Sequence, residues 1–145
     1  MVPTRFAVAI HVLLLLASDA VPRPATSGRL AASVNTNPVV VRRITGLLAR
    51  AGLIQVKRGP GGAELARPAA GISLADVWDA VNPGCRRPLL PVHATPDPHC
   101  AVGRNVGAVL GRAFDLAEAA MQAELRRTTL DGLLSGLACP SPATR

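Results

Sequence analysis

Aromatic residues are scarce in this sequence. Its 145 residues include one Trp, two Phe and no Tyr. Proteins that bind single-stranded nucleic acid or RNA loops stack the bases on aromatic side chains, so the composition argues against both classes. The apolar content of 49% is high enough for a folded core, and the length suits one domain with an appendage.

Cysteines are also few, and they lie far apart. The three positions are Cys85, Cys100 and Cys139. An odd number of widely spaced cysteines does not form the disulfide framework of a small secreted protein, so we expect a reducing cytoplasm.

The N-terminal segment admits two interpretations. Arg5, followed by FAVAIHVLLLLA and SDA, resembles a secretory signal peptide with a small-residue cleavage site. Alternatively, residues 4–18 form a core helix in which His11 is a polar interruption. The apolar run is too short to span a bilayer as a helix, so we expect no membrane partner.

No catalytic set is recognisable either. The sequence has no Ser, His and Asp in an order supported by a motif, and no paired carboxylates in a cleft-like context. The segment RGPGG joins two expected strands and does not open a helix, so it is not a phosphate-binding loop. We therefore expect that the protein is not an enzyme.

Acidic residues are almost absent between residues 29 and 67. Seven basic residues against one acid, Glu64, give this stretch a net charge of +6 out of +7 for the chain. Residues 68–145 balance seven basic residues with seven acidic ones. Charge concentrated in one stretch is typical of a surface that contacts nucleic-acid phosphates. The alternative is a solvated basic helix face without a partner.

The same stretch predicts two helices separated by a turn. Thr26 can cap a helix that ends near Val34. Asn37 followed by Pro38 is a strong start for the second helix, because Asn accepts first-turn amides and Pro needs no donor there. Gly52 can end this helix. Apolar periodicity predicts four inward-facing residues in it: Val41, Ile44, Leu47 and Leu48.

Two short strands are expected next, at residues 53–56 and 63–66, around a glycine-rich tip. A helix, a turn, a helix and a β-hairpin in this order form a winged helix-turn-helix. The predicted fold is therefore mostly α-helical with a small β-wing, extended by a long C-terminal helix.

The second half of the chain predicts helices separated by a loop. Ser73 and Asp76 have the spacing of a capping box at a helix start. Residues 83–99 hold five prolines and no periodicity, which indicates a loop. The apolar pattern then fits one long helix over residues 101–127 and a short helix through Leu137.

A single helix as long as 101–127 is rarely stable unless its apolar face is covered, and a second copy of the chain is the simplest cover. Glycines at four-residue intervals on one stripe allow close approach of another helix. These glycines are Gly103, Gly107 and Gly111. We therefore predict a homodimer built mainly on residues 101–137.

These patterns divide the chain into five parts. They are a winged helix-turn-helix DNA-binding domain (1–68), a linker helix (69–82), a sensor-type loop (83–100), dimerisation helices (101–137) and a tail (138–145). The end of the tail, from residue 139 on, is expected to be frayed.

Several segments together resemble the Rrf-two family of bacterial transcription regulators. They are RFAVAIHVL, SVNTNPVVVRRITGLLARAGLI, RGPGGAELARPAAGISLADVWDAV and CAVGRN. The wing segment followed by ISLADV is the most specific, and the resemblance covers nearly the whole chain. It implies a dimeric winged helix protein, usually a repressor, that binds a pseudo-palindromic operator in double-stranded DNA.

The resemblance also implies which residues contact DNA. The first turn of the recognition helix faces the major groove, and the wing reaches the minor groove. The residues concerned are Thr36, Asn37, Val39, Val40, Arg42 and Arg43 in the helix, and Lys57, Arg58 and Gly59 in the wing. The residue chemistry agrees, because arginine suits guanine, asparagine suits adenine and valine meets a thymine methyl group. Lysine suits a phosphate contact.

The resemblance fails at the sensor loop. Cluster-binding members carry three closely spaced cysteines there, whereas here fourteen residues separate Cys85 from Cys100. Gly103 replaces a histidine that accompanies the last cysteine in one member. Because an iron–sulfur cluster normally takes four strong protein ligands, we expect neither a cluster nor another cofactor.

Three interpretations of this loop remain open. Cys100, near a helix N-terminus that lowers the thiol pKa, suits a redox-sensing thiolate with Cys85 as its resolving partner. Together with His93 and His99, the two cysteines have the ligand types of a zinc site, although the spacing is irregular. In the third, Cys100 is a small buried residue and the histidines are solvated.

The sequence thus predicts a cytoplasmic, homodimeric regulator of transcription, and a repressor in particular. Its rival from another class is a protein-interaction scaffold whose basic face binds an acidic partner. Operator binding requires a steep loss of affinity with salt and discrimination of roughly 10³ or more over random duplex. A scaffold shows neither property.

Overall fold

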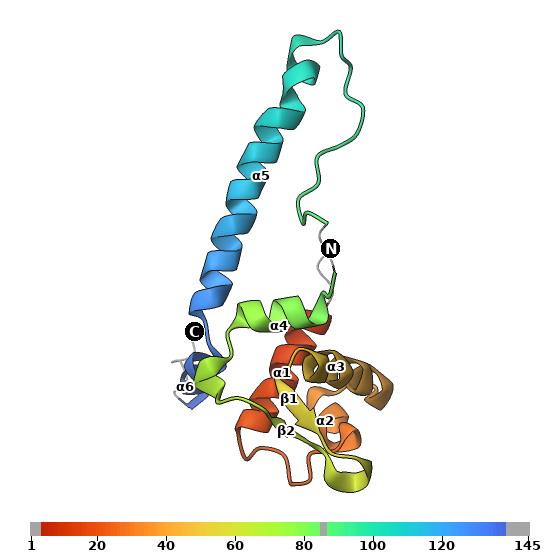
Figure 1. Ribbon diagram of the computed structural model, residues 1–145, viewed down its shortest axis with the longest axis vertical. Coiled ribbons are helices and arrows are strands. Elements are labelled where there is room, and N and C mark those ends of the chain that lie inside the picture. Colours follow the sequence, from red (N-terminus) through yellow and green to blue (C-terminus); the bar gives the residue numbers. More distant parts are fainter. Residues whose placement is uncertain (1–3, 85–86, 139–145) are drawn as a thin grey trace, which may run out of the picture.

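The structure, a computed structural model, describes residues 4–84 and 87–138 (Figure 1). Its elements in chain order are α1 (Arg5–Ala17), α2 (Ser27–Val34), α3 (Pro38–Arg50), β1 (Ile54–Val56), the short 3₁₀ helix η1 (Gly59–Gly61), β2 (Ala63–Leu65), η2 (Ala69–Gly71), α4 (Leu74–Val81), α5 (Ala101–Arg127) and α6 (Leu130–Ala138). The predicted fold class, mostly helical with a two-stranded wing, is confirmed. The end of the expected tail, residues 139–145, lies outside the described residues. Within the described part, no helix has the length and apolar character to cross a membrane.

The helix starts follow the capping residues in the sequence. The Thr26 side chain accepts a backbone N–H of α2 at 3.3 Å, and Asn37 Oδ1 accepts one of α3 at 2.8 Å. At α4, Ser73 and Asp76 exchange side-chain and backbone hydrogen bonds of 2.9 and 3.1 Å, a complete capping box. These bonds satisfy donors that the first turn of a helix leaves unpaired. The predicted starts of α2, α3 and α4 are confirmed.

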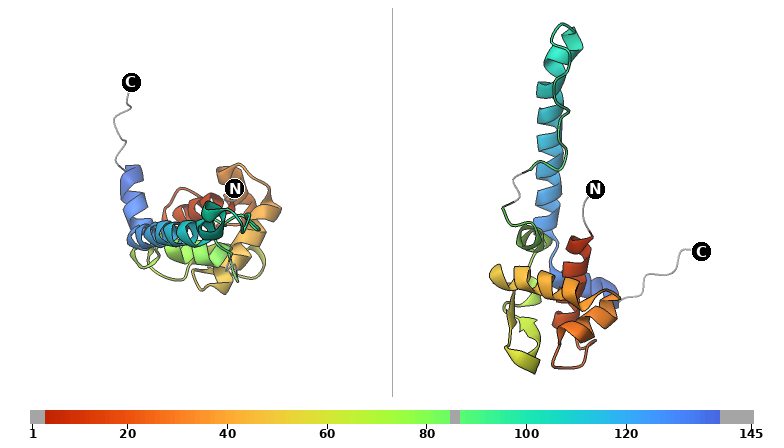
Figure 2. Two further views of the ribbon diagram at one scale, coloured as in Figure 1. Left: turned by 90° about the horizontal axis from the view of Figure 1, so that it is seen from above. Right: turned by 90° about the vertical axis from the view of Figure 1, so that its right-hand side faces the viewer.

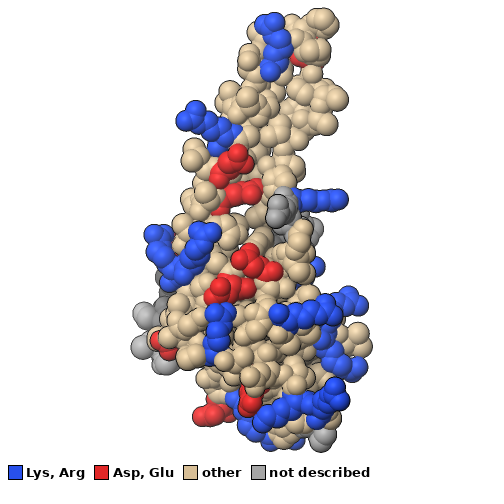
Figure 3. Space-filling model, in the orientation of Figure 1, with Lys and Arg blue, Asp and Glu red and all other residues tan. Residues whose placement is uncertain are grey.

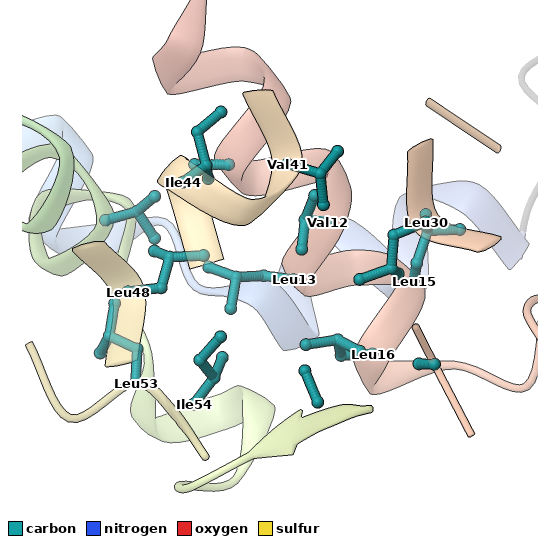
Figure 4. Packing of buried hydrophobic residues seen from close by; sticks show 14 of the residues in the cluster. Val12, Leu13, Leu15, Leu16, Leu30, Val41, Ile44, Leu48, Leu53 and Ile54 are labelled. Atoms are coloured by element: carbon teal, nitrogen blue, oxygen red, sulfur yellow. The ribbon is translucent and has the colours of Figure 1, made fainter. Parts of the chain in front are cut away.

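α1 is the central helix of the head, which we define as residues 5–81. Its residues Ala9, Val12 and Leu13 are completely buried, and α1 contacts α2, α3, α4, β2 and α6. Figure 4 shows Leu13 in the middle of the apolar cluster, beside Leu48 of α3. α1 therefore has the burial of a core helix, as one interpretation of residues 4–18 expected.

The inward face of α3 differs from the expectation at one position. Three of the four predicted residues are buried, but Leu47 is only half-buried and Thr45 is buried instead. The Thr45 hydroxyl donates to the carbonyl of Arg42 at 3.0 Å, which offsets the cost of burying a polar group.

α5 projects away from the head, as Figures 1 and 2 show. None of its 27 residues is buried. Its C-terminal end is tied to the head, because Leu74 N–H donates to the Thr128 carbonyl at 2.8 Å and Leu130 N–H donates to the Ile72 carbonyl at 3.0 Å. Leu130, the first residue of α6, is fully buried. α6 thus packs on the head, whereas α5 contacts α4 and then projects away from the head.

The proline-rich loop runs beside α5 toward its N-terminal end (Figure 1). The Leu90 N–H donates to Glu118 Oε1 at 2.8 Å. A Cβ at Gly103 would lie 2.4 Å from the Asp97 carbonyl oxygen, so the loop backbone approaches α5 where only glycine fits. We expected another helix along the glycine stripe; at Gly103 the neighbour is the chain's own loop. The other two glycines meet nothing within 4 Å in the described residues.

Candidate nucleic-acid interface

α3 presents a mixed apolar and basic face to solvent. Val39 and Val40 are 53% and 39% exposed, and Arg42 and Arg43 are exposed beside them. The opposite face of α3 is fixed in the core of the head, so these four side chains cannot turn inward. Thr36, in the turn before α3, is half-buried.

Asn37 is the N-cap residue of α3. Its Oδ1 accepts the Val39 N–H at 2.8 Å. Recognition of adenine by asparagine uses both the oxygen and the NH₂ group of the amide. While it caps α3, Asn37 therefore has its NH₂ group and one lone pair of Oδ1 left for a further contact.

The wing is an antiparallel hairpin in which Ile54 pairs with Leu65 and Val56 with Ala63. Where the sequence predicted a turn, its tip forms the short 3₁₀ helix η1. The three predicted wing contacts are all exposed: Lys57, Arg58 and Gly59.

Gly62 holds the wing against the segment that precedes α2. Its φ of +69° lies in the left-handed region that favours glycine. A Cβ at this position would lie only 2.7–2.8 Å from backbone atoms of Ala25. The Ala63 N–H also donates to the Ala25 carbonyl at 3.0 Å. The wing therefore has a fixed position beside α2.

α2, α3 and the wing surround an open cavity of about 360 Å³. Its polar lining comes from Thr26, Ser27, Arg42, Thr45, Lys57 and Arg58. The sequence predicted the three basic residues as site residues but missed the three hydroxyl residues. No motif links them, because three separate segments contribute to the cavity.

Basic side chains gather at this end of the molecule. In Figure 3 they lie at the lower right, where Figure 1 places α3 and the wing, whereas both signs of charge occur along α5. Among the described residues, Arg42, Arg43 and Arg58 have no acidic partner within 4.0 Å. Arg23 instead donates to the Leu16 carbonyl at the end of α1, and Arg29 donates to the Pro24 carbonyl in the α1–α2 connection, each at 2.9 Å.

Cys100 is exposed and occupies the N-cap position of α5. The pKa of its thiol is lowered, because the backbone N–H groups of Gly103 and Val102 stabilise the thiolate. The interpretation of Cys100 as a small buried residue is wrong. Cys85, the predicted resolving partner, lies outside the described residues.

The described residues do not provide a metal site. No three His, Cys, Asp or Glu side chains in residues 4–84 and 87–138 are grouped so that they could hold an ion. His93 and His99 are exposed. Because a cluster normally needs four ligands and Cys100 is the one cysteine in the described part, those residues do not fit an iron–sulfur cluster.

The chain matches the Rrf2 family, described as an iron-dependent transcriptional regulator, over residues 2–136. The chain belongs to the Rrf2 family. The resemblance to this family found in the sequence is confirmed, and the protein is a DNA-binding transcriptional regulator.

Individual relatives agree with this assignment. YwnA of Bacillus subtilis (strain 168), named as a proposed HTH-type transcriptional regulator, is 39% identical over 137 residues, which are 94% of this Rrf2 chain and 99% of YwnA. The crystal structure of a proposed DNA-binding protein is 36% identical, with a TM-score of 0.71 over 90% of this chain and 98% of that one. CymR, the global cysteine regulator of Bacillus subtilis, has a TM-score of 0.64 at 22% identity, over 93% of this chain and 96% of its own. At that identity the likeness concerns the fold alone.

Proposed function

We propose that this Rrf2 family protein is a cytoplasmic homodimer that binds a pseudo-palindromic operator and represses transcription by occluding a promoter. The observation that supports this most is the exposed face of α3, where two valines and two arginines stand beside a basic wing. The exposed side chains on this face of α3 do not pack in the core of the head. Their size and chemistry suit contacts with base edges in the major groove.

Each exposed group suits a part of the duplex. Arg42 and Arg43 can each donate two hydrogen bonds to guanine, and Val39 and Val40 can pack against thymine methyl groups. Arg58 enters the minor groove from the wing. The remaining proposed contacts position the protein on the backbone or at the groove edge. They come from Thr36, Asn37, Lys57 and Gly59.

α5 supplies the proposed dimer interface. Val102, Val109 and Leu116 recur every seven residues and are 71%, 66% and 66% exposed. Val106 and Ala113 lie between them, so the steps alternate between four and three residues, the spacing of a coiled-coil seam. A second copy of α5 offers the same stripe, and a twofold axis makes the stripe self-complementary.

This dimer determines the form of the operator. Two heads related by a twofold axis read two half-sites of inverted orientation. Their recognition helices reach successive turns of the same duplex face when the half-sites are separated by about one helical turn or a small multiple of it.

We further propose that Cys100 makes operator binding sensitive to oxidants, without a metal cofactor. Its exposure and its lowered pKa both favour attack by a thiolate on a peroxide. Peroxide should then change the operator affinity of the wild type but not of Cys100→Ser. Equal affinities with and without peroxide in both proteins would contradict the thiol proposal and leave DNA binding untouched.

The test of operator binding is selection of duplexes from a random library by the purified full chain. We expect enrichment of one palindrome, bound at least about 10³-fold more tightly than random duplex and more weakly as salt rises. No enrichment by reduced or oxidised protein would contradict the proposal. The interaction-scaffold alternative would then explain the basic surface.

A further inference from the structure

The cavity between α2, α3 and the wing has the lining of an anion site. Arg42, Lys57 and Arg58 bring three positive charges to it from two different elements. Lys57 shares its charge with Glu64, 3.6 Å away in an exposed pair. The other two have no acidic partner within 4.0 Å among the described residues, so the cavity carries net positive charge.

The first turn of α2 adds hydrogen-bond donors at the same place. Thr26 and Ser27 line the cavity. The first amides of a helix have no acceptor within the helix, and the Thr26 side chain satisfies only that of Arg29. In the part of the chain that the structure describes, the N–H groups of Ser27 and Gly28 have no acceptor. Free amides and the positive end of the helix dipole both favour an anion.

The walls of the cavity are fixed before any ligand arrives. The wing is tied to Ala25 by the 3.0 Å hydrogen bond from Ala63 and by the close approach of Gly62. The Lys57 N–H donates to the Gly62 carbonyl at 2.9 Å and closes the tip. Donors held in place in this way lose little conformational entropy when they bind.

We propose that this cavity binds one backbone phosphate of the operator in each half-site and thereby fixes the register of α3 in the major groove. This inference rests on the proposed operator binding. Arg42 and Arg58, which line the cavity, also belong to the proposed DNA-contacting face, so a strand that follows this face passes the cavity. A phosphodiester accepts several hydrogen bonds at once, which suits the two free amides, and the positive charges beside them attract it. Such a contact sets position and not sequence.

Two substitutions of Ser27 isolate the contribution of its amide. Proline suits the first position of a helix, and Thr26 already has the extended conformation, φ −76° and ψ 159°, that a residue before proline adopts. Ser27→Pro removes both the amide hydrogen and the hydroxyl, whereas Ser27→Ala removes only the hydroxyl. Equal thermal unfolding midpoints for the two variants establish that both fold.

The experiment uses the selected duplex with one neutral methylphosphonate at successive backbone positions. The wild type and Ser27→Ala should lose about tenfold in affinity at one phosphate of each half-site. Ser27→Pro should bind the unmodified duplex about tenfold more weakly than Ser27→Ala and should respond less to the change at that phosphate, because only the Gly28 amide remains. If Ser27→Pro matches Ser27→Ala at every position, the phosphate assignment is wrong.

NMR of the wild type gives a test that needs no variant. The amide signals of Ser27 and Gly28 should shift with the unmodified duplex and not with the duplex neutral at the identified phosphate. The assignment would be overturned if submillimolar inorganic phosphate saturated these shifts and if no single phosphate of the duplex affected them. The cavity would then be a site for a free anion. Failure of operator binding itself is recognised separately, because the wild type would then prefer no duplex.

Discussion

The head and α5 are stabilised in different ways. The head has a continuous buried cluster with Leu13 and Leu48 inside it, whereas α5 buries none of its 27 residues and leaves Val109 and Leu116 66% exposed. The head can therefore fold around its own core, whereas we propose that a second copy covers the apolar stripe of α5. In this proposal DNA contact and dimerisation depend on separate regions, and substitutions should separate their effects.

The largest expected effect comes from a charge in the α5 stripe. Val109→Asp places an unpaired carboxylate from each copy in the dimer interface, which should destabilise the dimer by about 3–5 kcal/mol. Light scattering at micromolar concentration should then give a monomer, while circular dichroism still shows a folded head.

Ala108→Asp is the matched control, because residue 108 is also exposed but lies about 100° away around the helix. This variant should remain a dimer. If Val109→Asp also remained a dimer, the stripe would not be the interface.

Truncation in the head core has the next largest effect. Leu13→Ala removes a completely buried side chain and should lower the free energy of unfolding by about 2–5 kcal/mol. Urea unfolding should show this loss at every protein concentration. Leu116→Ala should instead act through the dimer, so its effect should shrink as the protein is diluted. If the loss in free energy of unfolding depended on protein concentration in the same way for both variants, the head and α5 would not be stabilised differently.

Loss of one arginine from the recognition face should have a smaller, sequence-dependent effect. Arg43→Ala should cost about 1–3 kcal/mol of operator affinity and relax the base preference at one position in each half-site. Arg112→Ala removes the same charge from the exposed surface of α5 and should change operator affinity much less. Fluorescence anisotropy with single-base operator variants measures both quantities. Equal losses for the two variants would mean that only net charge matters.

The smallest expected effect is a shift in the pH dependence of Cys100 alkylation, at the junction of the loop with α5. Because its pKa is lowered, Cys100 should be a thiolate at lower pH in the folded protein than in the unfolded chain. In the variant Cys85→Ser, Cys139→Ser, the alkylation rate of Cys100 by iodoacetamide should reach half its maximum at lower pH without denaturant than in urea. A half-maximum at the same or higher pH would contradict the role given to the first-turn amides.

Local signals explain why the helices could be predicted. Asn37 with Pro38, and Ser73 with Asp76, define helix starts through hydrogen bonds within four residues, and the structure has those bonds. Burial along α3 was less predictable. The helical periodicity predicts that Leu47 lies on the buried face of α3, but the packing of α3 on the head buries Thr45 instead.

Features that join distant segments could not be predicted. The course of the loop along α5 depends on the Leu90–Glu118 hydrogen bond and on the fit of Gly103 against Asp97, and neither has a motif. The cavity beside the wing likewise requires that Ala25 and Gly62 meet, which only the folded chain brings about. The predicted base-contacting residues could be named from the sequence, whereas the hydroxyl residues beside them could not.

We propose that one dimer joined through α5 reads two half-sites with its two heads. The most direct test compares the selected operator with a copy that has five extra base pairs between its half-sites. Half a helical turn places the second half-site on the opposite face of the duplex. We predict that affinity falls at least about 100-fold, to the level of a single half-site. Unchanged affinity for the lengthened operator would mean that the two heads do not read the two half-sites together.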